Sequence, residues 1–221
     1  MSLVIFSCSP RVKSQSHTAA IVDAFKRGYV LESNEEVMVY YLNIRKEWPR
    51  YKKVFEVSTK IIFAMPLFVE GVPGLVMEFI EYLEPKKASI GEETRIGFIL
   101  QGGFEEAHQF RTAEHYLEKL PFYLGCEYAG TLIKGGMFAL SVASEAAKQK
   151  KLQGFYKMGS LYAKEERFVK EQVTQFAAPE VYSKFMIILS RITRPMNAVA
   201  WKWLAKKFGA ETPLDTKPYE I

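Results

Sequence analysis

Short apolar runs, separated by helical patterns, dominate the first part of the chain. Each run has the length of a strand, is rich in β-branched or aromatic residues and ends at a turn-forming segment. The five runs cover residues 3–6, 37–42, 59–65, 95–101 and 128–133. Because they are largely apolar rather than alternating, they indicate strands buried on both faces, as in a parallel sheet.

Between these runs, apolar residues recur with the spacing of amphipathic helices. The three stripes are Ala20, Ile21, Ala24, Phe25 and Tyr29; Val76, Phe79, Ile80 and Leu83 within residues 74–84; and Phe110, Ala113, Leu117, Leu120 and Leu124. Gly28 stands where the first helix is expected to end, and Pro121 predicts a bend in the third. Residues 43–58, with Trp48-Pro49 in the middle, form a polar segment that predicts irregular structure.

Strand and helix therefore alternate five times, which predicts the α/β class. The expected architecture is a three-layer sandwich, with a five-stranded parallel sheet between helices on both faces. In such folds the ligand lies beyond the carboxyl ends of the strands, where the strand order reverses. Three loops are suited to that position: residues 7–18, 66–74 and 101–108.

Beyond residue 138 no further strand pattern is visible. Residues 139–175 have helical character, and residues 180–208 are apolar, aromatic and basic. The longest unbroken apolar run in the latter is five residues, too short to span a bilayer. We expect a core domain over residues 1–138 and a helical extension over 139–221. Packing of the extension on the core or on a second subunit is favoured over contact with a membrane surface.

The net charge of +5 is unevenly distributed. Residues 1–138 carry 16 basic and 17 acidic side chains, whereas residues 139–221 carry 14 basic and 8 acidic ones. A solvated basic face is the favoured interpretation, and an acidic partner, an anionic membrane or a phosphorylated cosubstrate are the alternatives. Because no nucleic-acid-binding module accompanies these charges, a nucleic-acid partner is not expected.

The two cysteines, Cys8 and Cys126, form neither a disulfide framework nor a metal-ligand pattern. The amino terminus has neither the basic region nor the long apolar stretch of a signal peptide. The chain is therefore expected to be cytoplasmic. His17, His108 and His115 show no metal-binding spacing, so no metal is expected.

The loop after the first strand is unusually rich in hydrogen-bond donors. They are Ser9, Arg11, Ser14, Ser16, His17 and Thr18, with Lys13 as a further cation. The start of the following helix adds unpaired backbone N–H groups and a positive dipole end. This combination predicts a phosphate site. The alternative is a polar turn in which Ser16 only caps the helix.

Other phosphate-binding loops do not fit the spacing. The chain has no G-x-x-x-x-G-K-[ST] sequence and no G-x-G-x-x-G after its first strand. Low-molecular-weight tyrosine phosphatases use C-x5-R at this position. Here Cys8 is in place, but Ser14 lies six residues on and Arg11 only three.

Three segments resemble flavodoxin-like NAD(P)H-dependent FMN reductases and quinone reductases. The loop at residues 7–18 resembles G-S-P-R-x-x-S-x-T, with Cys8 in place of the glycine. Residues 61–80 resemble a strand that ends in P-x-Y/W, followed by a loop with P-G/A and a helix. Phe68 stands at the aromatic position of this motif. Met77-Glu78 stands where the family commonly has a lysine and any residue (K-x), which is a small departure. Residues 100–104 resemble the glycine-bearing loop after the fourth strand. The match covers roughly residues 1–138.

The resemblance implies an FMN site and NAD(P)H as cosubstrate. Ser9, Arg11, Ser14, Ser16, His17 and Thr18 would bind the phosphate and ribityl chain, Pro66, Leu67, Phe68 and Val69 the isoalloxazine ring, and Gly102, Gly103 and Phe104 its other edge. A flat ring of this kind needs apolar walls, and glycines let the backbone approach closely. Phe68 packed on the core and a simple strand-ending turn at Gly102-Gly103 are the structural alternatives.

The implied activity is an FMN-dependent NAD(P)H oxidoreductase that passes electrons to a quinone, azo, nitro or flavin acceptor. A flavodoxin-type electron carrier and a flavin-free interaction module are the alternatives. Hydride transfer depends on stacking and dipoles more than on an acid or base, so no catalytic side chain is assigned. His108 is either a solvated loop residue or a proton donor. The family also implies a homodimer, and residues 43–58 lack the cysteines of its iron–sulfur branch.

Overall fold

The computed structural model describes residues 2–85 and 94–210, leaving aside the side chains of residues 194–198. The chain divides into two compact units, Met1–Glu180 and Val181–Ile221. We call them the core unit and the C-terminal unit and describe each by itself.

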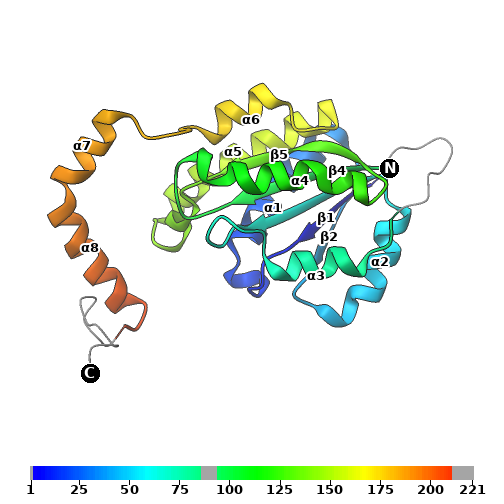
Figure 1. Ribbon diagram of the computed structural model, residues 1–221, viewed down its shortest axis with the longest axis horizontal. Helices are drawn as coiled ribbons and strands as arrows, with labels where there is room; N and C mark the ends of the chain where they lie inside the picture. Colours follow the sequence, from blue (N-terminus) through cyan, green and yellow to red (C-terminus); the bar gives the residue numbers. More distant parts are fainter. Residues whose placement is uncertain (1, 86–93, 211–221) are drawn as a thin grey trace. The chain divides into compact units, whose positions relative to one another are not determined.

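A parallel sheet forms the centre of the core unit (Figure 1). Within the described residues its strands are β1 (Leu3–Ser7), β2 (Val37–Tyr41), β3 (Lys60–Pro66), β4 (Arg95–Gln101) and β5 (Glu127–Lys134). They pair in the order β2-β1-β3-β4-β5, and each pair is parallel. The predicted α/β class and five-stranded parallel sheet are confirmed.

Helices cover both faces of this sheet, as Figure 1 shows. The helices are α1 (His17–Ser33), α2 (Trp48–Val57), α3 (Gly74–Tyr82), α4 (Arg111–Tyr123), α5 (Glu145–Glu165) and α6 (Lys170–Ala177). Short 3-10 turns are η1 (Lys13–Gln15), η2 (Arg45–Glu47), η3 (Ala107–Phe110) and η4 (Met137–Ser141). Alternate strand residues supply two apolar clusters, one shared with α2, α3 and α4 and the other with α1, α5 and α6.

Two glycines bring α1 and α5 into close contact. A Cβ atom on Gly28 would lie 1.9 Å from the carbonyl oxygen of Tyr156, and one on Gly159 would lie 2.0 Å from that of Phe25. The prediction that α1 ends near Gly28 was wrong, because the helix runs on to Ser33. Close packing of the two helix backbones explains this glycine, rather than a helix end.

The segment 43–58 was also predicted incorrectly, since it contains η2 and α2 rather than irregular chain. Pro49 lies in the first turn of α2, where a proline needs no N–H donor. Trp48, Tyr51 and Phe55 are buried on one face of α2, between exposed polar residues that hide the pattern in the sequence.

The helical character predicted beyond residue 138 is confirmed in α5 and α6, and in α7 (Lys184–Ile192) and α8 (Arg194–Lys207) of the C-terminal unit. The core unit runs to Glu180 and includes α5 and α6. Division of the chain at residue 138 stays a prediction. Among the described residues, no helix is long and apolar enough to cross a membrane.

Candidate functional site

The loops that follow β1, β3 and β4 meet at the carboxyl edge of the sheet, because these three strands are neighbours. The N–H of Cys8 donates to the carbonyl of Ala64 over 2.8 Å, and the N–H of Leu67 donates to that of Gln101 over 2.8 Å. The strand order reverses at β1, so the loops after β1 and β3 flank the switch point at which ligands bind in open parallel sheets.

The loop after β1 is organised around the start of α1. Ser16 caps the helix, and its Oγ accepts the N–H of Ala19 over 3.1 Å. Ser9 Oγ accepts the N–H of Arg11 over 3.2 Å. The backbone N–H groups of His17 and Thr18 have no hydrogen-bond partner within the described part of the chain. They therefore remain available to an anion at the positive end of the helix dipole.

Arg11 and Ser14 are exposed on this loop. The side chain of Asn43 donates from Nδ2 to the Arg11 carbonyl over 3.2 Å, which ties the loop to the end of β2. Lys13 is directed elsewhere: its Nζ lies 5.5 Å from the centre of the Tyr41 ring. A hydrogen bond with Tyr41 raises the pKa of Lys13. Arg11 is thus the cation available to a ligand of this loop.

His17 and Thr18 are bonded to distant parts of the chain. Thr18 is 1% exposed, and its Oγ1 accepts a hydrogen bond from Gln101 Nε2 over 3.3 Å. His17 Nε2 lies 3.1 Å from Ser141 Oγ. Burial lowers the pKa of His17, and the nearby positive charges of Arg11 and Lys148 lower it further. The two side chains connect the start of α1 to the end of β4 and to η4.

Ser7, the last residue of β1, carries a buried hydroxyl without a hydrogen-bond partner among the described residues. Leu3 and Ile5 of the same strand lie in the cluster shared with α1, so Ser7 points to the α1 face by alternation. A buried polar group without a partner is costly and rare. A ligand or water at the start of α1 would satisfy it.

The loop after β3 presents an exposed aromatic side chain on a tight turn. Pro66 is buried and ends the strand, and Leu67 packs partly on the core. Phe68 and Gly71 exchange backbone hydrogen bonds of 3.1 and 2.9 Å around Val69 and Glu70, whose φ angles are 48° and 63°. Positive φ at a β-branched residue is strained, and such strain often accompanies functional loops. Phe68 is 54% exposed, so its ring is not packed in the core.

The loop after β4 combines a packed glycine with an open one. A Cβ atom on Gly102 would lie 2.9 Å from the Phe110 ring, whereas one on Gly103 would have no neighbour closer than 3.8 Å. The carbonyl of Phe104 accepts the N–H of Gly136 over 2.7 Å, and the Phe104 side chain is 66% exposed. Packing against Phe110 explains Gly102 without a ligand, while Gly103 and Phe104 leave accessible surface.

Sequence reasoning missed four polar residues that organise this edge. They are Ser7, Asn43, Gln101 and Ser141. Gln101 was detectable, since a lone amide at the end of an otherwise apolar strand needs a partner. Asn43 and Ser141 carry no local signal, because their partners lie 32 and 124 residues away.

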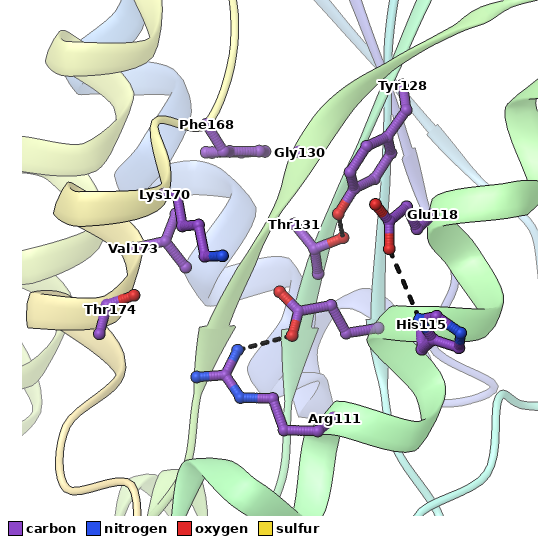
Figure 2. A pocket seen from close by; sticks show the side chains of 11 residues that line it. Arg111, His115, Glu118, Tyr128, Gly130, Thr131, Phe168, Lys170, Val173 and Thr174 are labelled. Carbon is purple, nitrogen blue, oxygen red and sulfur yellow. Dashed lines mark hydrogen bonds and ion pairs between the residues drawn. The ribbon is translucent and has the colours of Figure 1, made fainter.

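A cavity of about 590 Å³ lies elsewhere, along the outer strand β5 between α4 and α6 (Figure 2). Arg111 in its wall pairs with Glu114 and Glu180, at 2.6 Å each, and the hydroxyls of Tyr128 and Thr131 are 2.7 Å apart. None of the sequence-predicted site residues lines it. Since these polar groups are bonded to one another, we assign the cavity no role.

No family model matches the chain, and no curated protein does. Solved structures do match. An FMN-dependent NADH-azoreductase from Bacillus anthracis, in complex with FMN, superposes with a TM-score of 0.54 at 14% identity, over 75% of this chain and 99% of that one. An NAD(P)H:quinone oxidoreductase from Methanothermobacter marburgensis superposes with a TM-score of 0.51 at 17% identity, over 72% of this chain and 96% of that one. General stress protein 14 from Treponema denticola, also in complex with FMN, superposes with a TM-score of 0.54 at 13% identity, over 74% of this chain and 98% of that one.

The chain has a flavodoxin-like fold. At identities of 13 to 17% the likeness establishes the architecture. The predicted flavodoxin-like sandwich is therefore confirmed. The flavodoxin-like core accounts for nearly all of each of these three neighbours, and about a quarter of the present chain has no counterpart in them.

Proposed function

We propose that the chain is an FMN-dependent NAD(P)H oxidoreductase that reduces small-molecule acceptors of the quinone, azo, nitro or flavin type. The observation that carries the proposal is the meeting of three loops at the carboxyl edge of the sheet, where the start of α1 offers backbone N–H groups and the loops after β3 and β4 each expose an aromatic ring. The flavodoxin-like neighbours include an azoreductase and a quinone oxidoreductase, which supports this class of activity.

The donor set fits the phosphate of FMN. A phosphate needs several converging donors, and the start of α1 offers the N–H groups of His17 and Thr18, the Arg11 guanidinium and the hydroxyls of Ser9 and Ser14. The hydroxyl of Ser7, which has no partner among the described residues, lies on the same face of the sheet. Ser16 and Thr18 would act differently, by holding the helix start in place through bonds to Ala19 and Gln101.

The loops after β3 and β4 suit a flat aromatic ring. Phe68 and Phe104 are exposed on neighbouring loops, and Gly103 lets the backbone approach closely. Pro66 and Leu67 anchor the first loop in the core, so the turn at Val69 is held in position. Bound FMN would supply reversible hydride acceptance, while these residues orient the ring and keep water from one side of it.

Anaerobic reduction tests the proposal. The purified chain, incubated with FMN and freed of excess flavin, should be yellow and should lose its absorbance when NADH or NADPH is added without oxygen. An acceptor panel then measures turnover. A protein that stays colourless would contradict flavin binding. A yellow protein bleached by dithionite but by neither nicotinamide would favour the electron-carrier alternative.

A further inference from the structure

The C-terminal unit exposes two apolar stripes. On α7 they are Phe185, Ile188, Leu189 and Ile192, and on α8 and the residue after it Trp201, Leu204, Ala205 and Phe208, of which Leu204 and Ala205 are partly buried. Both sets have i, i+3, i+4, i+7 spacing, so each lies along one side of its helix. Phe185 is 70% exposed, Ile192 71% and Phe208 60%. Contiguous apolar surface of this kind marks an interaction site.

The same segment is basic as far as residue 210. Residues 181–210 contain six lysines and arginines and no aspartate or glutamate. The remaining residues, 211–221, add one lysine and three acids, so the segment 181–221 keeps a net charge of +4. On α7, Lys184 and Arg191 are seven residues apart and lie together, away from the apolar stripe. Apolar and cationic surfaces therefore run side by side.

Tryptophan is concentrated at this surface. Of the three tryptophans of the chain, Trp48 is 7% exposed in the core, whereas Trp201 and Trp203 are 56% and 61% exposed on α8. The Lys207 ammonium lies 5.1 Å from the centre of the Trp203 ring. Tryptophan and lysine together are typical of helices at a membrane–water interface, where the indole is half buried and the ammonium reaches the headgroups.

We propose that the C-terminal unit binds the surface of anionic lipid bilayers, with α7 and α8 lying in the interface rather than crossing it. The helices have nine and 14 residues, against the roughly 20 needed to span the hydrocarbon core. The apolar stripes enter the headgroup–acyl boundary, and Lys184, Arg191, Lys202, Lys206 and Lys207 supply the positive charge that attracts anionic lipids. The proposal does not depend on flavin binding or on reductase activity.

Other occupants fit the surface less well. A second copy packed on this segment would bring together two segments that each carry a net charge of +4, which opposes a symmetric interface. Nucleic acid would use the charges but would leave the apolar stripes uncovered. An acidic protein groove remains as an outcome that the experiment must separate from lipid.

Vesicle co-sedimentation of the full chain tests the proposal. Vesicles of phosphatidylcholine with about 30% phosphatidylglycerol should pellet the protein at low salt, and pure phosphatidylcholine should not. Raising the salt to about 0.5 M should weaken binding at least tenfold, because the charges are then screened. Emission of Trp201, which lies on the apolar stripe of α8, should shift to the blue on binding, and Trp201→Phe should abolish the shift.

A charge-matched pair of variants identifies the surface. Lys202→Glu, Lys206→Glu and Lys207→Glu together should lower the affinity for anionic vesicles at least tenfold. Lys46→Glu, Lys53→Glu and Lys150→Glu change the net charge equally at exposed positions of the core unit and should leave most of the binding. Circular dichroism checks that both variants are folded.

Three results would overturn the proposal. One is no binding to anionic vesicles at low salt. Another is an equal loss of binding in both triple variants, which would show a general charge effect. The third is a self-association in light scattering, without vesicle binding, that the triple variant of α8 abolishes. Each can be distinguished from failure of the proposed function, because none of them involves flavin or nicotinamide.

Discussion

At the residue scale, the loop after β1 divides its polar side chains between two tasks. Ser16 and Thr18 are buried and bonded to Ala19 and Gln101, so they shape the loop. Arg11 and Ser14 are exposed and are free to approach a ligand from solvent. The phosphate site proposed here therefore depends on Arg11 and backbone N–H groups more than on the buried hydroxyls.

Replacing Arg11 and Ser9 by alanine should weaken FMN binding. Loss of a charge-assisted phosphate contact costs about 1.5–3 kcal/mol, so the dissociation constant should rise about 10- to 150-fold. Fluorescence titration of FMN measures it. Lys13→Ala is the matched control in the same loop and should have a much smaller effect, because Lys13 is engaged with Tyr41. Equal affinity in the double variant and the parent would mean that the phosphate lies elsewhere.

His17 should make the flavin-free protein sensitive to acid. Burial, Arg11 and Lys148 lower its pKa from 6.5, so the folded state favours the neutral ring. The stabilising contribution is present above the unfolded pKa and is lost as the pH falls below it. The free energy of unfolding should decrease as the pH falls from about 6.5 through the lowered pKa of the folded state, and less so in His17→Asn. Parallel pH profiles for the two proteins in urea denaturation would contradict this assignment.

At the element scale, α1 packs on one face of the sheet and is held in place by its crossing with α5. Gly28 and Gly159 let the two helix backbones touch. The helix start that carries His17 and Thr18 is positioned by this crossing and by Gln101 at the end of β4. The start of α1 is therefore coupled to a helix that begins more than 110 residues after α1 ends.

Gly28→Ala should destabilise the fold. The new Cβ would meet the Tyr156 carbonyl at 1.9 Å, so the helices must separate. Overpacking of this kind costs about 2–3 kcal/mol or more in the free energy of unfolding. Chemical denaturation measures the change. Gly74→Ala in the first turn of α3 has no atom within 4 Å and should be neutral or slightly stabilising. A Gly28→Ala protein as stable as the Gly74→Ala protein would refute the close crossing.

At the scale of the whole molecule, the core and C-terminal units have different kinds of surface. The described apolar clusters of the core unit end at Ala177, after α6. The C-terminal unit has large apolar side chains that are mostly exposed. The core unit thus buries its own apolar residues. The C-terminal unit leaves apolar residues exposed, which suits contact with a membrane surface or a protein partner.

A chain ending at Glu180 should therefore fold like the full chain. Its thermal unfolding, followed by circular dichroism, should stay cooperative with a similar midpoint, and FMN affinity should be kept. A chain ending at residue 138 is the contrasting case. It lacks Phe155, Met158 and Tyr162 of α5, which cover one face of the sheet, and should aggregate or remain unfolded. Folding of the shorter chain would establish residue 138 as the boundary.

The sequence by itself determined the strands, their alternation with helices and the loops at the carboxyl edge. These follow from local periodicity and turn residues, as at Pro66 and Gly102. Only the tertiary structure decided which polar side chains of the loop after β1 bind other parts of the chain and which stay exposed. It also decided why position 28 is a glycine. Thr18 meets Gln101 across 83 residues, and Gly28 meets Tyr156 from another helix. Such pairings depend on packing between distant segments, which no local pattern records.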